Sequence, residues 1–336
     1  MTFYTLLRLH QRIKSRRLKL LGLLAASKFG LRHLSIRIDP VLGCNLACRM
    51  CSFSSAEFRK KQKGALTKEE MEGIARVLFP RSFQLMVGCG AEPTKHPGYL
   101  ELFKLAKKYG VPDIGIVTNG QTLKRHDIEV MKETGVREIT LSVHGVKKGT
   151  YEKFMTGASY EKFLEVMANI KQIREQSGDK KKPAIRINYT VNSENLEELK
   201  DFFEVFRQLP VDVLQIRPIM DIGGKYRKQL TEDLIPKYNE TIRILEEECG
   251  QRNIRLLANT MDASYDKPNH DSDIAGLVYT YISPKTAGQL DVNWQQSSFS
   301  EYRKSDKWIP QLWKVFLRKN SEGNGLDKSL KYEDLS

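Results

Sequence analysis

From residue 34 onward, short runs of aliphatic and β-branched residues alternate with longer segments whose apolar residues recur at helical spacing. Strands that alternate with helices along a chain predict parallel strand pairing and right-handed crossovers. We therefore predict an α/β fold built on a partial (β/α)6 TIM-like barrel, with its site at the C-terminal ends of the strands. The six predicted strands are residues 34–39, 83–88, 114–118, 138–144, 184–191 and 213–217.

Several helix boundaries are marked by capping signals. Thr67, followed three residues later by Glu70, predicts a capping box at the start of a helix. Gly110 and Gly135 follow two further helical segments, at the position where a left-handed residue is favoured. Other helices are predicted at residues 160–175, 196–208, 232–251 and 302–318.

The regular alternation of strands and helices ends after the sixth strand. We predict that the chain is divided into four segments. They are a basic amphipathic N-terminal helix at 1–33, the barrel at 34–249, a small α+β C-terminal region at 250–318 and a flexible tail at 319–336. In the C-terminal region, strand-like residues 278–282 and 289–293 flank Ser283-Pro284, which predicts a hairpin. No apolar run is long enough to cross a bilayer.

Three of the five cysteines, Cys44, Cys48 and Cys51, fall within eight residues directly after the first predicted strand. An odd total with three crowded together is not a disulfide framework and suits a reducing compartment where thiolates hold a metal. A structural zinc normally takes four ligands. A cubane iron–sulfur cluster usually takes four cysteines, so three would leave one iron open for a substrate or cofactor. A zinc site and cysteines without a metal stay the alternatives at this point.

Together with later segments, this loop resembles the radical S-adenosylmethionine superfamily. The family hallmark is a C-x3-C-x2-C loop after the first barrel strand, which the three cysteines match. Residues 88–97, Gly-Cys-Gly-Ala-Glu-Pro-Thr-Lys-His-Pro, are similar to its G-G-E-P segment. Thr118-Asn119-Gly120 is similar to its T-N-G, residues 142–145 to its S-x-D/H-G, and Asn188 occupies another familiar place. The resemblance covers about residues 34–220.

The resemblance implies one [4Fe–4S] cluster, whose open iron chelates the amino and carboxylate groups of S-adenosylmethionine. An electron from a reductant such as flavodoxin or ferredoxin then cleaves the sulfonium to a 5′-deoxyadenosyl radical, which abstracts hydrogen from a substrate. The implied catalytic and metal residues are Cys44, Cys48 and Cys51. The implied cofactor contacts are Met50, Gly90, Ala91, Glu92, Asn119, Ser142 and Asn188.

The resemblance leaves the substrate open among a peptide, a lipid-linked molecule, a sugar and an RNA. The outcome is equally open among oxidation, methylation, adenosylation and cross-linking. Many relatives carry a cysteine-rich SPASM or twitch domain after the barrel; the predicted hairpin resembles part of it, but its cysteines are missing. A different class, a basic nucleic-acid-binding module with a structural metal, stays the alternative, although the sequence shows no stacking-aromatic RNA motif.

Three positions depart from the family pattern. Met50 replaces a common aromatic residue, and its polarizable apolar side chain can still lie against adenine. Ala91 replaces the second glycine of G-G-E-P, which requires a negative φ there. Met155 stands where the family often has an arginine that reaches the cofactor carboxylate, so Lys153 or Arg217 would have to take that role.

The formal net charge of +14 is concentrated at the front of the chain, where no acidic residue precedes Asp39. Residues 4–30 place leucines on one helical face with arginines beside it, which is typical of a helix on an anionic membrane surface. A helix that caps the base of the barrel is the alternative. We expect a cytoplasmic protein, peripheral to the inner face of the membrane if this helix binds lipid. The lysines and arginines of the predicted segment 1–33 are Arg8, Arg12, Lys14, Arg16, Arg17, Lys19, Lys28 and Arg32.

Overall fold

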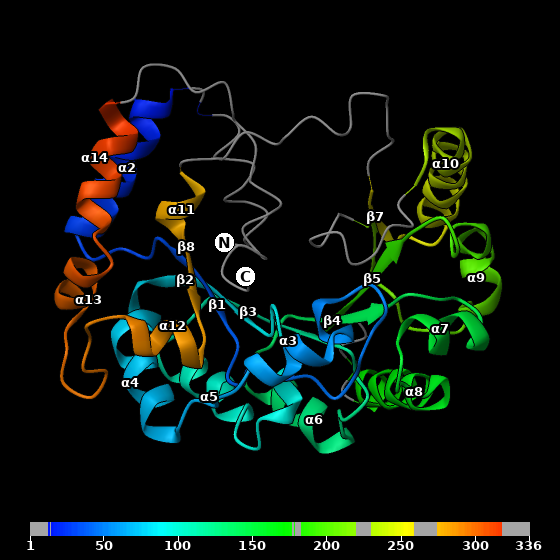
Figure 1. The fold of residues 1–336 in the computed structure, drawn as a ribbon, viewed down its shortest axis with the longest axis horizontal. Helices are drawn as coiled ribbons and strands as arrows, with labels where there is room; N and C mark the ends of the chain where they lie inside the picture. Colours follow the sequence, from blue (N-terminus) through cyan, green and yellow to red (C-terminus); the bar gives the residue numbers. More distant parts are fainter. Residues whose placement is uncertain are drawn as a thin grey trace. The chain divides into compact units, whose positions relative to one another are not determined.

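The fold is known from a computed structural model that describes residues 13, 15–176, 178, 183–219, 230–258 and 274–317. The strands of these residues belong to one sheet in the order β7-β6-β5-β4-β3-β2-β1-β8, which does not close on itself (Figure 1). The predicted α/β fold with a partial TIM-like barrel is thereby confirmed. The strands are β1 (Leu34–Ile38), β2 (Ser82–Val87), β3 (Asp113–Thr118), β4 (Glu138–Val143), β5 (Ala184–Val191), β6 (Val213–Pro218), β7 (Arg255–Leu257) and β8 (Tyr279–Ile282).

The chain forms two compact units. The first unit comprises Met1–Leu42, Gly64–Ile116 and Pro268–Ser336, and the second comprises Gly43–Lys63 and Val117–Lys267. The predicted division into four segments followed changes of sequence texture rather than contacts, and it stays a prediction.

In the first unit, β1 lies between β2 and β8 and pairs in parallel with both. Ile36 of β1 lies opposite Leu85 of β2 and Thr280 of β8, so residues from both ends of the chain share this part of the sheet. The helices of this unit are α2 (Arg16–Lys28), α4 (Lys68–Leu78), α5 (Leu100–Lys108), α11 (Ala275–Val278), α12 (Pro284–Gln289), α13 (Phe299–Ser305) and α14 (Trp308–Leu317), with the short 3-10 turns η2 (Phe79–Arg81) and η3 (Pro93–Lys95).

In the second unit, β4, β5, β6 and β7 pair in parallel in that order. The register places Ser142 of β4 opposite Asn188 of β5, which in turn lies opposite Gln215 of β6. The helices of this unit are α3 (Ala56–Lys61), α6 (Arg125–Glu133), α7 (Lys148–Phe154), α8 (Tyr160–Gln176), α9 (Phe202–Val205) and α10 (Ile235–Gln251), with the 3-10 turns η1 (Ser52–Ser54), η4 (Glu197–Asp201) and η5 (Glu232–Leu234).

Strand β5 has two faces of different chemistry. Ile185, Ile187 and Tyr189 are fully buried, whereas Arg186 and Asn188, which alternate with them, are partly exposed. A parallel strand that is covered on both faces reads as a continuous apolar run. The polar face of β5 therefore does not belong to the dry core of this unit.

The capping signals of the sequence are confirmed. Thr67 begins α4 with both hydrogen bonds of a capping box, because its hydroxyl accepts from the Glu70 N–H at 3.1 Å and the Glu70 carboxylate accepts from the Thr67 N–H at 2.7 Å. Gly110 and Gly135 follow α5 and α6 with φ values of 63° and 85°. A side chain at either position would be strained, which explains why the helices end there.

The predicted hairpin around Ser283 is wrong. The Ser283 hydroxyl instead accepts from the Thr286 N–H and caps α12, and Pro284 occupies the first turn of that helix. Serine followed by proline is a favoured helix start as well as a turn signal. Strand β8 pairs with β1, so the strand-like residues before Ser283 complete the main sheet instead of a separate hairpin.

Other elements differ from their predicted extents. The sheet has eight strands among the described residues, because β7 and β8, from the predicted C-terminal region, join the six strands predicted for the barrel. Residues 196–208 form the 3-10 turn η4 and the short α9 in place of one helix. The predicted helix at 302–318 is broken between α13 and α14 by Lys307, whose φ is 51°.

Helix α2 confirms the later part of the predicted N-terminal helix, while residues 1–12 and 14 lie outside the described residues. The predicted flexible tail at 319–336 also lies outside them. Within the described part of the chain, every helix is too short or too polar to traverse a bilayer.

Candidate active site

The cysteine loop, residues 44–51, lies in the second unit and is held by its backbone. The Ala47 N–H donates to the Thr156 carbonyl at 3.0 Å, and the Arg49 N–H donates to the Phe154 carbonyl at 2.9 Å. Both acceptors lie at the C-terminal end of α7, whose last carbonyl groups lack partners within the helix. The helix end therefore supplies the acceptors that fix this loop.

The thiols of Cys44, Cys48 and Cys51 are partly exposed, and none forms a disulfide. Among the described residues, no three His, Cys, Asp or Glu side chains gather closely enough to bind one metal ion together. In a cubane, each cysteine binds a different iron, so its thiolates stand farther apart than the ligands of a single ion. Three accessible thiols on one pinned loop fit a cluster of this kind, and their soft donor chemistry suits iron and sulfide.

Asn119 lies at the end of β3 and contacts the cysteine loop. Its Nδ2 donates to the Asn45 Oδ1 at 2.9 Å and lies 3.7 Å from the Cys44 Sγ. The Leu46 N–H also points to this sulfur, at 3.4 Å. The T-N-G resemblance implied a cofactor contact for Asn119, and the structure adds a direct contact with the first cysteine. That contact depends on Asn45, which sequence reasoning did not single out.

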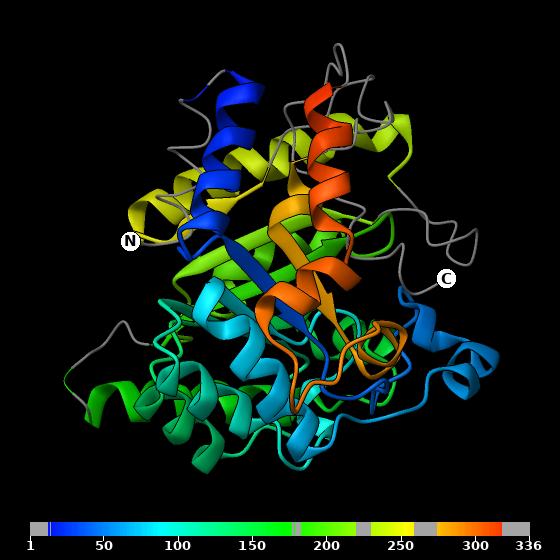
Figure 2. The ribbon, with the colours of Figure 1, turned by 90° about the vertical axis from the view of Figure 1, so that its left-hand side faces the viewer.

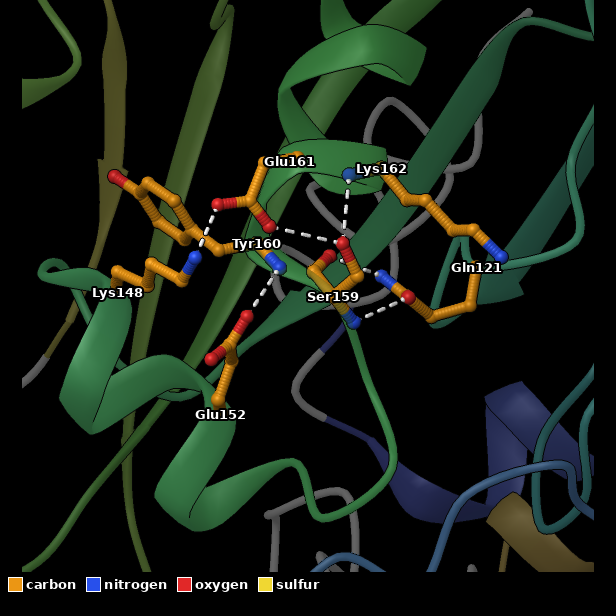
Figure 3. Close-up of polar contacts among 7 residues, drawn as sticks. All are labelled: Gln121, Lys148, Glu152, Ser159, Tyr160, Glu161 and Lys162. Carbon is orange, nitrogen blue, oxygen red and sulfur yellow. Dashed lines mark hydrogen bonds and ion pairs between the residues drawn. The ribbon is translucent and has the colours of Figure 1, made fainter.

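Gln121 fixes the turn that carries Asn119. Its N–H donates to the Asn119 Oδ1 at 2.9 Å, and its side chain reaches Ser159, where it accepts from the N–H at 2.7 Å and donates to the carbonyl at 3.1 Å. Figure 3 shows this amide facing Ser159, whose hydroxyl caps the first turn of α8 through the Lys162 N–H. The Gln121 amide also donates to the Tyr151 hydroxyl, and burial raises the pKa of that phenol.

Met50 is buried in a small cluster with Phe154 and Ile219. The Asn192 Nδ2 donates to its sulfur at 2.8 Å, so its thioether has a polar partner as well as apolar ones. This packing fixes one side of the cysteine loop, between Arg49 and Cys51. The contact of Met50 with a cofactor stays a prediction, and Asn192 is a neighbour that the sequence pattern did not reveal.

Ser142 and Asn188 lie side by side on the polar face of β4 and β5. The Asn188 Oδ1 is buried and has no hydrogen-bond partner among the described residues. A buried acceptor without a partner costs about 1–3 kcal/mol, so we expect a water molecule or a bound ligand to donate to it. A hydroxyl or amine of a cofactor would supply that donor, and the orphaned oxygen fits the role that the resemblance implied for Asn188.

The loop after β2, residues 88–92, lies in the first unit and is held by Asp39. The Asp39 carboxylate accepts from the Cys89 N–H at 2.6 Å, from the Gly90 N–H at 2.8 Å and from the Tyr281 hydroxyl at 2.7 Å. Asp39 is fully buried, and this burial raises its pKa against the opposing effect of these hydrogen bonds. Gly88 has a φ of 81°, which permits the chain to turn at the start of the loop.

Ala91 adopts the conformation that the sequence required, and Glu92 beside it is fixed by hydrogen bonds. Ala91 is not one of the described residues whose φ is positive, and a negative φ is what its replacement of glycine requires. Glu92 is buried, and its Oε1 accepts from the Thr94 N–H at 3.1 Å and the Thr94 hydroxyl at 2.6 Å. The carboxylate thereby caps η3 and is held in one orientation. Its predicted contact with the methionyl amine stays a prediction.

The residues around this loop have structural roles. The His96 Nδ1 accepts from the Gly98 N–H at 3.0 Å, so its Nε2 carries the proton and donates to the Leu66 carbonyl at 2.8 Å. His96 therefore holds the backbone of Gly98 against that of Leu66. In the second unit, Lys153 pairs with Glu194 at 2.6 Å, and the role predicted for Lys153 or Arg217 in place of the missing family arginine stays a prediction.

Residues 38–206 match the family model described as the radical SAM superfamily. Among curated relatives, the GTP 3′,8-cyclase of Alkaliphilus metalliredigens (strain QYMF) is 25% identical over 193 residues, which are 56% of this chain and 58% of the relative. Molybdenum cofactor biosynthesis protein 1 of Drosophila melanogaster is 29% identical over 223 residues, which are 65% of this chain and 37% of the relative. The chain thus spans less than two thirds of the length of these relatives.

Two solved structures share the fold. Streptococcus suis SuiB bound to S-adenosylmethionine superposes with a TM-score of 0.61 at 16% identity, covering 89% of this chain and 72% of that chain. Native anSMEcpe with bound AdoMet and a Cp18Cys peptide superposes with a TM-score of 0.59 at 17% identity, covering 85% of this chain and 84% of that chain. With the family model matching half of its length, this protein belongs to the radical S-adenosylmethionine superfamily, whose enzymes use a [4Fe–4S] cluster and S-adenosylmethionine.

Proposed function

We propose that this enzyme cleaves S-adenosylmethionine reductively to a 5′-deoxyadenosyl radical, which abstracts hydrogen from a further substrate. The observation that carries the proposal is the cysteine loop, where Cys44, Cys48 and Cys51 present three accessible thiols on a backbone pinned to the end of α7. Three thiolates can hold three irons of a cubane and leave the fourth open to a chelating cofactor. This arrangement favours an enzyme over a nucleic-acid-binding module with a structural metal.

The other residues of the site bind and orient the cofactor in this proposal. Asn119 holds the cysteine loop by donating to Asn45 and lies beside the Cys44 sulfur, where N–H groups tune the potential of a cluster. Asn188 offers its unpaired Oδ1 to a hydroxyl or amine. Glu92 offers a carboxylate whose orientation Thr94 fixes, which suits a protonated amine.

We propose that one cluster suffices for this enzyme. The chain has five cysteines, and only Cys89 and Cys249 lie outside the cysteine loop. Both are buried, and burial raises the pKa of the Cys249 thiol to about 12, which disfavours the thiolate that a metal requires. A second cluster would need several thiolates together. The substrate is therefore held by side chains and backbone groups rather than by an auxiliary cluster.

The names of relatives direct the first substrate assays. Curated relatives are named GTP 3′,8-cyclases, and a SuiB structure is described as bound to its precursor peptide SuiA. We propose to test GTP and peptides first, followed by sugars, RNA and lipid-linked molecules. A small one-electron donor such as flavodoxin or ferredoxin is the proposed natural reductant, and dithionite replaces it in the assays.

The cluster is tested by anaerobic reconstitution of the full chain. We expect about four irons and four sulfides per chain. Cys44→Ala, Cys48→Ala and Cys51→Ala should each lose the cluster, whereas Cys249→Ala, a matched control at a buried position, should keep it. About eight irons per chain after desalting, or full iron in the Cys48→Ala variant, would contradict the proposal.

Cofactor cleavage is tested separately from cluster binding. With dithionite, the reconstituted enzyme should convert S-adenosylmethionine to 5′-deoxyadenosine and methionine, measured by chromatography and mass spectrometry. Glu92→Gln keeps the size of the side chain and its acceptor for Thr94, so the variant should keep its iron and lose most of this turnover. Equal turnover in the variant and the parent would remove the role proposed for Glu92.

A further inference from the structure

Exposed apolar side chains are concentrated on one part of the first unit. Isolated exposed apolar residues are normal on a protein surface, but a cluster of them marks an interaction site. Among the described residues, eight of the eleven exposed large apolar side chains lie on α2, on α14 or beside them. These eight are Ile13, Leu18, Leu21, Phe29, Leu31, Ile309, Trp313 and Leu317.

Helix α2 is apolar on two sides. Leu20 is fully buried on the side that packs against the protein, as a cap of the barrel base would require. Leu18, Leu21 and Phe29, spaced three and eight residues apart, lie on another side, where Leu18 is 62% exposed and Phe29 is 74% exposed. A surface helix of a soluble protein normally carries polar residues there. The outer side of α2 therefore lacks the polar character that water favours.

Helix α14 repeats this arrangement. Trp308 and Leu312 are buried on its inner side. Ile309, Trp313 and Leu317 follow one another at intervals of four residues, so they form one row along the outer side, where Leu317 is 73% exposed. The helical spacing of the sequence predicts a helix here, but the exposed apolar row is known only from the structure.

The two helices pack together in the same unit. Leu20 of α2 shares a core with Trp308 and Leu312 of α14, and an Arg16 N–H donates to the Val315 carbonyl at 2.6 Å. Figures 1 and 2 both show α2 and α14 next to each other, in blue and red. We call this pair the α2–α14 platform. It carries one exposed apolar row from each helix.

The charge of the platform is positive. No acidic residue precedes Asp39, and none occurs between Lys307 and Ser321. Arg17 and Lys28 of α2 and Lys314 of α14 are exposed beside the apolar rows. Glu301 and Asp306, the nearest acidic residues before α14, precede the helix and lie outside its outer row. Apolar rows flanked by lysine and arginine match a surface that is apolar inside and anionic outside, which is the surface of an anionic bilayer.

We propose that the α2–α14 platform binds the surface of an anionic lipid bilayer. The outer rows enter the boundary between headgroups and acyl chains, and the basic residues contact the anionic headgroups. Trp313 suits this position, because tryptophan favours the membrane interface. The proposal goes beyond the radical chemistry and does not depend on it, because the platform contains none of the cluster residues.

Vesicle flotation with the reconstituted full chain tests the proposal. We expect binding to vesicles of phosphatidylcholine with phosphatidylglycerol, much weaker binding to pure phosphatidylcholine, and a steep loss of binding as salt rises. Trp294 and Trp308 are buried, so a blue shift of tryptophan emission on binding would report Trp313. No binding to the anionic vesicles at low salt would overturn the proposal, as would equal binding to the neutral ones.

Substitutions in each helix locate the contact. Trp313→Glu in α14 and Leu21→Glu in α2 each place a charge where an apolar group would enter the membrane, and each should weaken binding about tenfold or more. Val205→Glu and Ile244→Glu are the matched controls, because these side chains are exposed to 42% and 41% on α9 and α10. All four variants should keep the parent's iron content. Undiminished binding of both platform variants would overturn the proposal.

A second copy of this chain is the competing occupant of the platform. It predicts a concentration-dependent dimer in size-exclusion chromatography that Trp313→Glu dissociates, together with no flotation of the parent protein. That pair of results would replace the membrane with a dimer interface. Deletion of α2 is a poorer test, because it would expose the buried Trp308 and Leu312 to water.

Discussion

The loops that follow β1 and β2 are built in different ways. The cysteine loop is tied to α7 through its backbone, and its three thiols are partly exposed. The loop of residues 88–92 is tied to a fully buried carboxylate, Asp39, which accepts from the N–H groups of Cys89 and Gly90. The first loop presents partly exposed thiols, while the second is held by hydrogen bonds to a carboxylate in the core. Damage to each loop should therefore have a different signature.

Asp39→Asn should give the largest effect on the second loop. The amide keeps one acceptor but presents an NH2 group to donors that the carboxylate satisfied, so unfolding free energy should fall by about 1–3 kcal/mol. Displacement of the loop should also reduce S-adenosylmethionine cleavage by about 100-fold. Iron content should stay at the parent value. Denaturant unfolding, cleavage assays and iron analysis check the three statements.

The half-buried Asp113 on β3, which accepts from the Gln84 amide at 3.2 Å, offers a matched control for Asp39. Asp113→Asn should change cleavage by less than about twofold, because Asp113 lies opposite Gln84, near the start of β2, whereas the loop of residues 88–92 follows the end of that strand. If Asp39→Asn instead lost its iron while the control did not, the two loops would not be separable in the way proposed.

Asn119→Ala should show the opposite signature. The variant loses the hydrogen bond to Asn45 and the N–H group beside Cys44, so cluster affinity should fall by about tenfold. Iron release to a chelator, followed by absorbance, measures this loss, and the midpoint potential of the remaining cluster should shift. The iron-free protein should lose only about 1 kcal/mol of unfolding free energy, because the Gln121 N–H loses its acceptor on Asn119. An unchanged release rate would show that Asn119 does not support the cysteine loop.

Tyr281→Phe sharpens the description of the second loop. It removes the hydroxyl donor to Asp39 and leaves the backbone donors of Cys89, Gly90 and Ala91, so the loss of unfolding free energy should be about 1 kcal/mol. Cleavage should fall less than in Asp39→Asn. A loss equal to that of Asp39→Asn would mean that the hydroxyl, and not the carboxylate alone, sets the loop.

The smallest expected effect is that of Asp306→Asn on the unfolding temperature. Asp306 lies outside both loops. Burial raises its pKa to about 6, against the opposing attraction of Arg303. A folded-state pKa above the unfolded value means that its stabilising contribution is complete below about pH 4 and is lost as the pH rises through about 6. Asp306→Asn should therefore unfold at a higher temperature than the parent at about pH 8, with the difference shrinking toward about pH 5. A constant difference across this range would contradict the raised pKa.

The sequence indicates the chemistry of the site better than it indicates the contacts that hold the loops of the site in place. The spacing of Cys44, Cys48 and Cys51 and the alternation of strands are local patterns, so both were visible before the structure. The contact of Tyr281 with Asp39 joins residues 242 positions apart, and no local pattern encodes it. Ser283-Pro284 failed as a hairpin signal because the same two residues also begin helices, and only the pairing of β8 with β1 decides between these outcomes.

The polar residues that hold the cysteine loop and its neighbouring turn in place also depend on contacts that no local pattern encodes. Asn45 and Gln121 are adjacent to recognised motifs, but their partners come from other elements of the second unit. Asn188 was found through its resemblance alone, and the structure supplies the physical reason, an acceptor left without a donor. A search for polar residues next to the motifs at strand ends could have found Asn45 and Gln121.

The pairing of β8 with β1 has a consequence for protein synthesis. Asp39 and Gly90 leave the ribosome long before Tyr281, which is 242 residues after Asp39. At the usual pace of about 5–20 residues per second, the loop of residues 88–92 waits roughly ten to forty seconds for β8. During that interval β1 has an open edge, and a nascent chain with an open edge is exposed to wrong pairing. Insertion of the cofactor before synthesis passes β8 would meet an incomplete site, so maturation of this enzyme should follow the release of its C-terminal strand.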